Sequence, residues 1–450
     1  MVAQSAFDRE GQLPRPSPSR AGRSATMAEA MALIPDGARV YITGLMGTPT
    51  ALVAGLAAHH HRWRRLTTVA DYLFAELATF ESPPGVAPDR WPFHHETVQP
   101  SPATAKLDPG RLSIIPAPSS AFYRLFRPGG PLEVDVALVQ VSPPGPDGTF
   151  SLGVAGGATP EVVCSADLVI AEVNLRMPHL PGPVAFARDR FDVLVETDHP
   201  PLYLPGAEAT MIGARADPDS VAGRIAGHLV NEIPERATIE YGIGAIPDAV
   251  VAALGQHRGL GLHSGLIGEA AMSLIDRGAM DGSHKTVDRG LHVASAVVGG
   301  PETLKWVRGR DDVVIVASNY SHGVPALARQ DRFVAINSAV EVSLDGSVNA
   351  EQVGGRVVSG PGGQPDFTAG AAQSTGGMAI VALPSTARRG TRSRIVAKLG
   401  PGVPTTVPRY LADRFVTEHG AARVGGATMA DRRTLLAAIA DEMFLRELLE

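Results

Sequence analysis

A repeat with a constant spacing of 198 residues is the feature of this sequence that most restricts its fold. Residues 38–44 (ARVYITG) match residues 236–242 (RATIEYG). The equivalent pairs are Gly44 and Gly242, Pro49 and Pro247, Ala51 and Ala249, Val53 and Val251, Leu56 and Leu254, and His59 and His257. Each copy has the pattern of a buried strand, a glycine turn and a helix opened by proline, whose missing N–H would have no partner there in any case. The repeat predicts two related halves with the same opening strand–helix unit.

Buried strands and amphipathic helices alternate along both halves. Apolar runs rich in β-branched residues occur at 39–43, 66–69, 112–115, 134–141, 168–173, 191–195, 313–317 and 379–383. Alanine-rich amphipathic segments occur at 51–58, 219–230 and 248–254. Continuous apolar strands separated by helices are typical of sheets that are covered on both faces. The pattern predicts an α/β fold with largely parallel sheets.

Three segments outside this alternation set the expected domain limits. Residues 1–24 are rich in Arg, Ser and Pro and lack an apolar run, which predicts a disordered leader. Residues 199–219 contain repeated Pro and Asp and form the natural linker, so we expect an N-terminal domain at 25–215 and a C-terminal domain at 216–450. Residues 430–449 predict one helix with Leu435, Ile439, Met443 and Leu448 on its apolar stripe, packed on its own domain or on a second subunit.

Composition excludes several classes of function. Forty basic and 46 acidic side chains give a net charge of -6, which provides no cationic field for nucleic acid or anionic membranes. No stretch approaches the ~20 apolar residues of a membrane span. Cys164 is the one cysteine, so an intramolecular disulfide and a multi-cysteine metal site are impossible. We expect a cytoplasmic protein with no metal and no permanently bound cofactor.

Two glycine loops are candidate binding elements. Gly242 and Gly244 lie between a predicted strand and a helix, where backbone N–H groups favour an anion or an oxyanion. A dinucleotide fingerprint is not favoured, because Pro247 occupies the third glycine position and no acidic residue occurs between Ala249 and Gly268. The second loop has the sequence SGPGGQPDF at 359–367 and contains Ser359, Gly360, Gly362, Gly363 and Gln364. Its glycines predict either oxyanion donors or a helix-capping loop.

The second half resembles the C-terminal domain of the acetyl-CoA hydrolase and 4-hydroxybutyrate CoA-transferase family. The motifs that carry the resemblance are YGIGAIPDA at 241–249, INSAVEV at 336–342, SGPGGQPDF at 359–367, LPSTA at 383–387, SRI at 393–395 and VTEHG at 416–420. The first half resembles the other domain of the family through GTPT at 47–50, VSPP at 141–144, SLG at 151–153 and AEVN at 171–174. The resemblance covers about 400 residues. It implies two NagB/RpiA-type domains with an active site in the cleft between them.

The sequence departs from this family at the position of its catalytic glutamate. The resemblance implies that a glutamate attacks the acyl-CoA carbonyl, but the family motif His-Thr-Glu corresponds here to His263, Ser264 and Gly265. Glu240 stands where the family usually has glutamine, and neighbouring parallel strands deliver their carboxyl ends to one crevice. Glu240 is therefore predicted as a replacement nucleophile or as a base for water, with Glu269 as the rival. A structural carboxylate at 240 and a solvent-facing first-turn acid at 269 are the alternatives.

The remaining expectations concern substrate handling. Asn337, in the INSAVEV motif, is predicted to hold the acyl carbonyl or CoA, although the following Asp345-Gly346 turn gives the motif a hairpin role as well. Lys285 and Arg394 are candidate partners for CoA phosphates. The resemblance predicts an oligomeric enzyme that uses CoA as substrate and acts on a small acyl-CoA and a carboxylic acid. Transfer of CoA, hydrolysis, and binding of acyl-CoA without turnover all remain open.

Overall fold

The computed structural model describes residues 22–180, 182–205, 217–242 and 244–449. The described residues form two compact units, one within 22–117, 121–205 and 295–319 and the other within 118–120, 217–294 and 320–449. The predicted domain boundary at Ala216 lies outside the described residues, as do the first 21 residues of the predicted leader.

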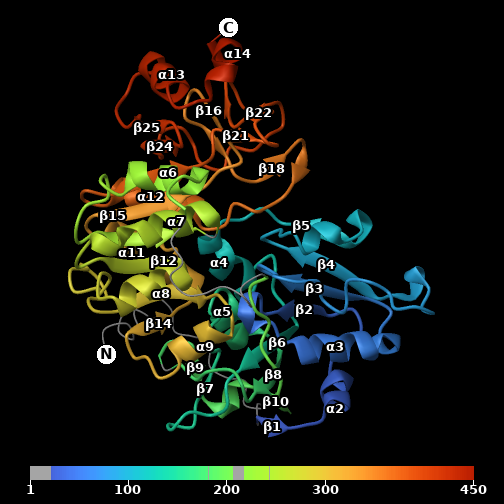
Figure 1. Ribbon diagram of the computed structural model, residues 1–450. Coiled ribbons are helices and arrows are strands. Elements are labelled where there is room, and N and C mark those ends of the chain that lie inside the picture. Colours follow the sequence, from blue (N-terminus) through green and yellow to red (C-terminus); the bar gives the residue numbers. More distant parts are fainter. Residues whose placement is uncertain (1–21, 181, 206–216, 243, 450) are drawn as a thin grey trace. The chain divides into compact units, whose positions relative to one another are not determined.

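The first large sheet has eight parallel strands in the order β1-β10-β8-β6-β2-β3-β4-β5. Their bounds are β1 Arg23–Ser24, β2 Arg39–Ile42, β3 Leu66–Ala70, β4 Phe93–Thr97, β5 Leu112–Ile114, β6 Val136–Val141, β8 Leu168–Asn174 and β10 Val193–Thr197. Apolar side chains of β2, β3, β4 and β6 form a core with two helices, α2 (Met27–Ala32) and α3 (Thr50–Ala58). Figure 1 shows these two helices beside each other.

The second large sheet has the order β14-β13-β12-β11-β15-β20-β24-β25. Its strands are β11 Thr238–Tyr241, β12 Gly261–Ile267, β13 His292–Val297, β14 Val313–Ile315, β15 Phe333–Asn337, β20 Met378–Ala382, β24 Arg414–Thr417 and β25 Gly420–Arg423. The five central strands, from β12 to β24, pair in parallel, and β25 is antiparallel to β24. The α/β class with largely parallel sheets is thus confirmed.

The two sheets share one topology. Counted outward from β2, the first sheet has β3, β4 and β5 on one side and β6, β8 and β10 on the other. Counted outward from β11, the second sheet has β12, β13 and β14 on one side and β15, β20 and β24 on the other. Because β2 and β11 are the strands of the 198-residue repeat, the repeat marks the central strand of each sheet.

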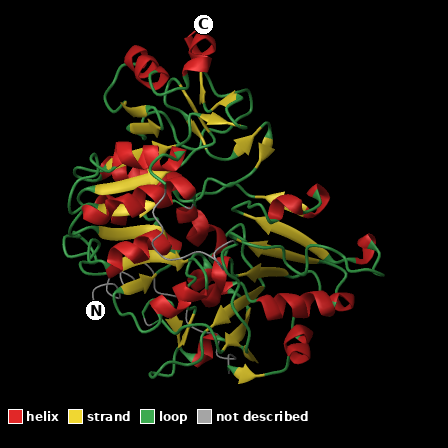
Figure 2. Cartoon of the chain, in the orientation of Figure 1, coloured by secondary structure: helices red, strands yellow, loops and turns green. Residues whose placement is uncertain are grey.

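Helices and short strands complete the units (Figure 2). The further helices are α4 Phe122–Phe126, α5 Thr159–Ser165, α6 Val221–Leu229, α7 Ala245–Ala253, α8 Glu269–Asp276, α9 Pro301–Val307, α10 Ser318–Ser321, α11 Val324–Ala328, α12 Gln364–Gln373, α13 Met429–Ala437 and α14 Leu445–Leu449. The short strands are β7 Phe150–Ser151, β9 Ala185–Phe186, β16 Glu341–Ser343, β17 Val348–Asn349, β18 Gln352–Val353, β19 Arg356–Val357, β21 Thr386–Ala387, β22 Arg392–Ser393 and β23 Ile395–Val396. No helix of the described residues is long and apolar enough to cross a membrane.

Two predictions near the chain ends are corrected. Arg23 and Ser24, assigned to the leader, form β1 and pair with β10. The single C-terminal helix is broken into α13 and α14, because Asp441 caps a new turn through a hydrogen bond from the Met443 backbone N–H to its side chain. Met443 is 73% exposed and therefore does not belong to the buried stripe.

A buried carboxyl in the first unit makes a testable contribution to stability. Glu161 of α5 is buried, and its Oε2 accepts no hydrogen bond within the described part of the chain. Burial raises the pKa of Glu161 from 4.5 to about 8. The folded state therefore binds this proton more tightly than the unfolded chain. The contribution of the Glu161 proton to the free energy of unfolding is complete below pH 4.5 and is lost as the pH rises through about 8.

We expect Glu161→Gln to remove this loss of stability. The free energy of unfolding, measured by urea denaturation from pH 5 to pH 8.5, should exceed that of the wild type by a few kcal/mol at the alkaline end, since one pKa unit corresponds to about 1.4 kcal/mol. Glu196→Gln, at an exposed position of β10, is the matched control and should leave the profile unchanged. If the free energy of unfolding depends on pH in the same way in Glu161→Gln and in the wild type, the raised pKa of Glu161 is contradicted.

Candidate active site

The carboxyl-terminal ends of β11 and β15 bring two predicted site residues into contact. The register pairs Glu240 with Ala335 in parallel, and Asn337 lies two residues farther along β15 on the same face. Asn337 Nδ2 donates a hydrogen bond of 2.8 Å to Glu240 Oε2. Ala335 also packs against Phe367 of α12, so this face of the sheet is the one that α12 covers. Glu240 therefore contacts the INSAVEV motif directly.

Glu240 is deeply buried, and this changes its chemistry. Its exposed fraction is 2%, and burial raises the pKa of its carboxyl well above 4.5, although the hydrogen bond from Asn337 acts in the opposite direction. Burial disfavours the charged form, so the un-ionised acid is favoured. An un-ionised carboxyl is a weak nucleophile. The geometry favours a role for Glu240 in holding Asn337 over the predicted role as nucleophile.

The second glycine loop leads into α12 and meets the end of β15. Gln364, the first residue of α12, donates from Nε2 to the carbonyl of Ser338 at 3.2 Å. The Gly362 carbonyl accepts from the Ser119 N–H at 3.0 Å, and Ser120 donates to the Asp366 carboxylate from both N and Oγ. Ser119 and Ser120 belong to the short Pro118–Ser120 piece of the second unit. These contacts fix the helix start beside Asn337.

Gly362 and Gly363 need glycine for different reasons. Gly362 has φ +58, a left-handed conformation, and an added Cβ would meet nothing within 4 Å. Gly363 has an ordinary φ of -88, but an added Cβ would lie 2.5 Å from His322 Cδ2 and 2.5 Å from Phe367 Cε2. The first glycine is required by the backbone and the second by a side chain that approaches it.

His322 is the site residue that sequence reasoning missed. An added Cβ on Gly265 would lie 3.2 Å from His322 Nε2, so the imidazole borders the position where the family has its glutamate side chain. The same ring contacts Gly363 and packs at a tilt against Phe367, with the ring centroids 4.6 Å apart. The available signal was the polar run that follows the predicted strand 313–317, since polar residues after parallel strands collect at one sheet edge.

Other predicted residues lie apart from this cluster. Glu269 opens α8 half-buried, where burial raises its pKa. Burial also raises the pKa of Asp248 on α7, and the charge of Glu269 adds to that rise. The Tyr241 hydroxyl, on the opposite face of β11 from Glu240, accepts from Gly268 N at 2.8 Å. Glu269 is therefore associated with Asp248 of α7.

The two glycines of the first loop have separate positions. Gly242 lies at the site, because an added Cβ would meet Asn337 Oδ1 at 3.2 Å. Gly244 has φ +137 and caps the start of α7. Of the second loop, Ser359 donates its N–H to the Glu351 carbonyl, and Gly360 is buried.

The two cations suggested as partners for CoA phosphates donate hydrogen bonds to backbone carbonyls of the protein itself. Lys285 is 1% exposed and donates from Nζ to the carbonyls of Leu262 at 2.9 Å and Leu291 at 2.8 Å. Arg394 is partly buried and donates to the Ala339 carbonyl. The phosphate role expected of Lys285 is wrong for this conformation, because its ammonium group is enclosed and already bound.

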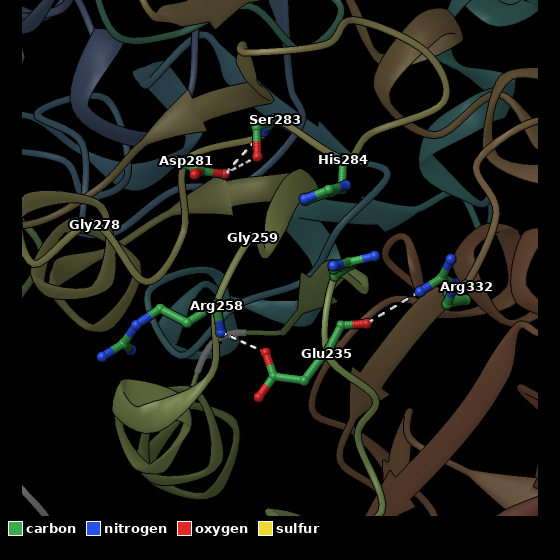
Figure 3. A pocket seen from close by; sticks show the side chains of 9 residues that line it. Glu235, Arg258, Gly259, Gly278, Asp281, Ser283, His284 and Arg332 are labelled. Carbon is green, nitrogen blue, oxygen red and sulfur yellow. Dashed lines mark hydrogen bonds between the residues drawn. The ribbon is translucent and has the colours of Figure 1, made fainter.

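A charged hollow of about 530 Å³ lies at the other end of the same sheet (Figure 3). It is lined by residues that precede β11, β12 and β15, among them Glu235, Arg258 and Arg332. The Glu235 carboxylate accepts from the Arg258 backbone N–H, and the Glu235 carbonyl accepts from Arg332. In parallel α/β sheets ligands bind at the carboxyl ends of the strands. The hollow is therefore distinct from the candidate active site.

Comparison with known proteins matches both halves of the chain. The acetyl-CoA hydrolase/transferase N-terminal domain matches residues 22–198, and the corresponding C-terminal domain matches residues 299–450. The 4-hydroxybutyrate coenzyme A transferase of Clostridium kluyveri is 37% identical over 318 residues, which are 71% of this chain and 72% of that protein. The chain belongs to the acetyl-CoA hydrolase/transferase family.

Solved structures agree over nearly the whole length. RipA from Yersinia pestis has a TM-score of 0.84 and 26% identity, covering 95% of this chain and 96% of that one. The 4-hydroxybutyrate CoA-transferase from Porphyromonas gingivalis has a TM-score of 0.77 and 28% identity over the same shares. The resemblance inferred from sequence motifs is confirmed, and so is membership of a family of enzymes.

The two glycines of the 359–367 loop give a paired test of the site geometry. We expect Gly363→Ala to lower the free energy of unfolding by about 1–3 kcal/mol, because the new methyl group must displace His322 or Phe367. Gly362→Ala should cost about 1 kcal/mol from backbone strain alone. Thermal denaturation gives both values, and the NMR signals of the His322 ring should shift in Gly363→Ala only. Equal ring shifts in the two variants would contradict the contact.

Proposed function

We propose that this enzyme cleaves the thioester of a small acyl-CoA at the carboxyl-terminal ends of β11, β12 and β15. The observation that carries the proposal is the convergence of Gly363, Gln364, Asn337 and His322 at the start of α12. The first backbone N–H groups of a helix have no intrahelical partner and point toward an anion, so they suit the oxyanion that forms on a thioester carbonyl. The glycine at 363 allows a close approach to the main chain.

In this proposal the acyl carbonyl oxygen is received by the amides at Gly362 and Gly363, within the loop of Ser359 and Gly360. Asn337, held by Glu240, orients the acyl group from the end of β15. Gly242 leaves room beside the Asn337 amide, and Gly244 lies at the start of α7. Each oxyanion donor of this kind typically contributes about 2.7–4 kcal/mol to the stabilisation of the transition state.

Hydrolysis is the reaction that the residues at the site favour. The covalent route of the family needs an ionised carboxylate at the acyl carbon, but position 265 is glycine and Glu240 is buried in a setting that favours its un-ionised form. Water can replace the carboxylate as the attacking group, and the family description includes hydrolases as well as transferases. The products are a carboxylic acid and CoA thiol.

Transfer of CoA to a carboxylic acid is the second candidate. It is supported by the names of the Clostridium kluyveri and Porphyromonas gingivalis relatives, both of which are CoA transferases. It would require Glu240 to ionise when substrate binds, or Glu269 to move to the acyl group. In either reaction CoA is a substrate, and no resident cofactor is proposed. The described residues contain no cluster of three or more His, Cys, Asp or Glu side chains that could hold a metal.

Location and assembly are further parts of the proposal. The single cysteine suits a reducing compartment, which supports the cytoplasm. Exposed Met429, Met443 and Leu449 lie on the C-terminal segment and offer apolar surface to a second copy of the chain.

An acyl-CoA panel distinguishes the candidates. The wild type is incubated with acetyl-CoA, propionyl-CoA, butyryl-CoA and succinyl-CoA, with and without acetate, and free thiol and new thioesters are followed by mass spectrometry. We expect thiol release that does not depend on acetate. New thioesters formed only with an added acid would support transfer instead. If the protein binds CoA but releases no thiol and forms no new thioester with any acyl-CoA, the result would support a binding protein and overturn the enzymatic proposal.

Glu240→Gln tests the role of the buried carboxyl. The glutamine Oε1 can still accept from Asn337 Nδ2, and no charge is removed if the acid is already un-ionised. We therefore expect turnover within about threefold of the wild type. Asn337→Ala is the contrasting variant, because it leaves the buried acid without its donor and should cost about 1–3 kcal/mol of stability. A loss of about 100-fold or more in a folded Glu240→Gln enzyme would restore Glu240 as nucleophile or base.

A further inference from the structure

We propose that His322 is the catalytic base of this site, taking the proton from the water that attacks the thioester carbonyl. The inference rests on the proposed acyl-CoA cleavage and assigns its missing catalytic group. It starts from the space at position 265, where the nucleophile of the family is absent. In the structure the imidazole of His322 lies beside that space.

Nε2 is the ring atom that faces the site. It would lie 3.2 Å from a Cβ on Gly265 and 2.7 Å from a Cβ on Gly363. A side chain at either position would crowd this nitrogen, and glycine at both positions avoids that. The Gly363 side of the ring is also the side of the proposed oxyanion donors, so an acyl carbon held at the start of α12 lies within reach of a water beside Nε2.

Ser321 holds the other ring nitrogen. Its Oγ lies 2.9 Å from His322 Nδ1, and Ser321 is fully buried. We assign the proton of the neutral ring to Nδ1, which then donates to Ser321 Oγ and leaves the lone pair on Nε2. A base whose second nitrogen is fixed by a buried partner keeps both its orientation and its tautomer. The tilted packing against Phe367 restricts the ring further.

Burial keeps the ring neutral in the resting site. Burial lowers the pKa of His322 from 6.5 to about 3, so the lone pair on Nε2 is not blocked at neutral pH. The oxyanion that forms beside the ring favours the charged imidazolium and thereby raises the basicity during the reaction. His263, a second buried histidine on β12, has Nδ1 3.4 Å from the Gln330 side-chain amide, and its ring centroid lies 5.8 Å from that of Tyr320.

The step balances without any further reactant. The water oxygen forms a bond to the thioester carbonyl carbon, one water proton moves to His322 Nε2, and the carbonyl oxygen becomes the oxyanion held at α12. The C–S bond then breaks, the carbonyl reforms as a carboxylic acid, and the CoA sulfur leaves with the proton from Nε2. The products are the acid and CoA thiol, and the ring returns to its neutral form.

His322→Asn tests the assignment. Asparagine keeps a polar group that can pair with Ser321, but it cannot act as a base near neutral pH. We expect thiol release to fall about 10²–10⁴-fold, the usual contribution of general-base catalysis. The affinity for CoA itself, measured by calorimetry, should change less than about threefold. His284→Asn, at an exposed position on the charged hollow, is the control and should keep wild-type turnover.

A rescue experiment separates a base from a structural side chain. In His322→Gly, added free imidazole can occupy the vacated space, and we expect it to restore thiol release in a concentration-dependent way while leaving His284→Asn unaffected. A structural role would not respond to imidazole. If His322→Asn proves unfolded, Ser321→Ala replaces it. That variant should lower turnover about tenfold with CoA affinity unchanged, because only the orientation of the ring is lost.

Several results would overturn the proposal. Turnover within tenfold of the wild type in folded His322→Asn would do so, as would an absence of imidazole rescue in a His322→Gly enzyme that still binds CoA. Failure of the proposed function itself is recognised separately, in the wild type. A wild-type enzyme that is silent on the acyl-CoA panel, or that forms only acid-dependent thioesters, overturns both the hydrolase proposal and the role of His322.

Discussion

The site depends on the parallel register between β11 and β15. That register places Glu240 beside Ala335 and lets Asn337, two residues farther, reach the buried carboxyl with its amide. A shift by one residue would turn one of the two side chains to the opposite face of the sheet. The contact would then be lost, and with it the surface against which the start of α12 is fixed. Strand pairing in the core thus sets the position of groups at the sheet edge.

Glycine is used here to bring a side chain close to the main chain. At Gly363 the backbone is ordinary, and the residue is small because the His322 ring lies against it. At Gly265 the same ring lies close to the Cα from the other side. The loss of the family glutamate and the approach of the imidazole are therefore parts of one packing arrangement. A glutamate at 265 would have to displace His322 by at least a few tenths of an ångström at its Cβ alone.

Burial determines the chemistry of the groups at this edge. Glu240 and His322 are both buried, so both favour their neutral forms, although one is an acid and the other a base. A neutral acid loses its value as a nucleophile, whereas a neutral imidazole keeps an available lone pair. Burial therefore disfavours Glu240 as a nucleophile, whereas it leaves His322 neutral until charge develops on the substrate beside it. The polar groups then act through hydrogen bonds of fixed direction.

The sequence by itself determined the α/β class, the repeat and the family. Apolar periodicity and the 198-residue spacing are local or pairwise properties, and they located β2 and β11 as equivalent strands. From the rule that parallel strands share an edge came the prediction that the strand ends carrying Glu240 and Gly265 open into one crevice. Only the tertiary structure decided that Glu240 is buried, that Lys285 is enclosed, and that His322 borders Gly265. Burial and the approach of a ring from a distant segment depend on how α10, α11 and α12 pack on the sheet. No spacing along the chain encodes that packing.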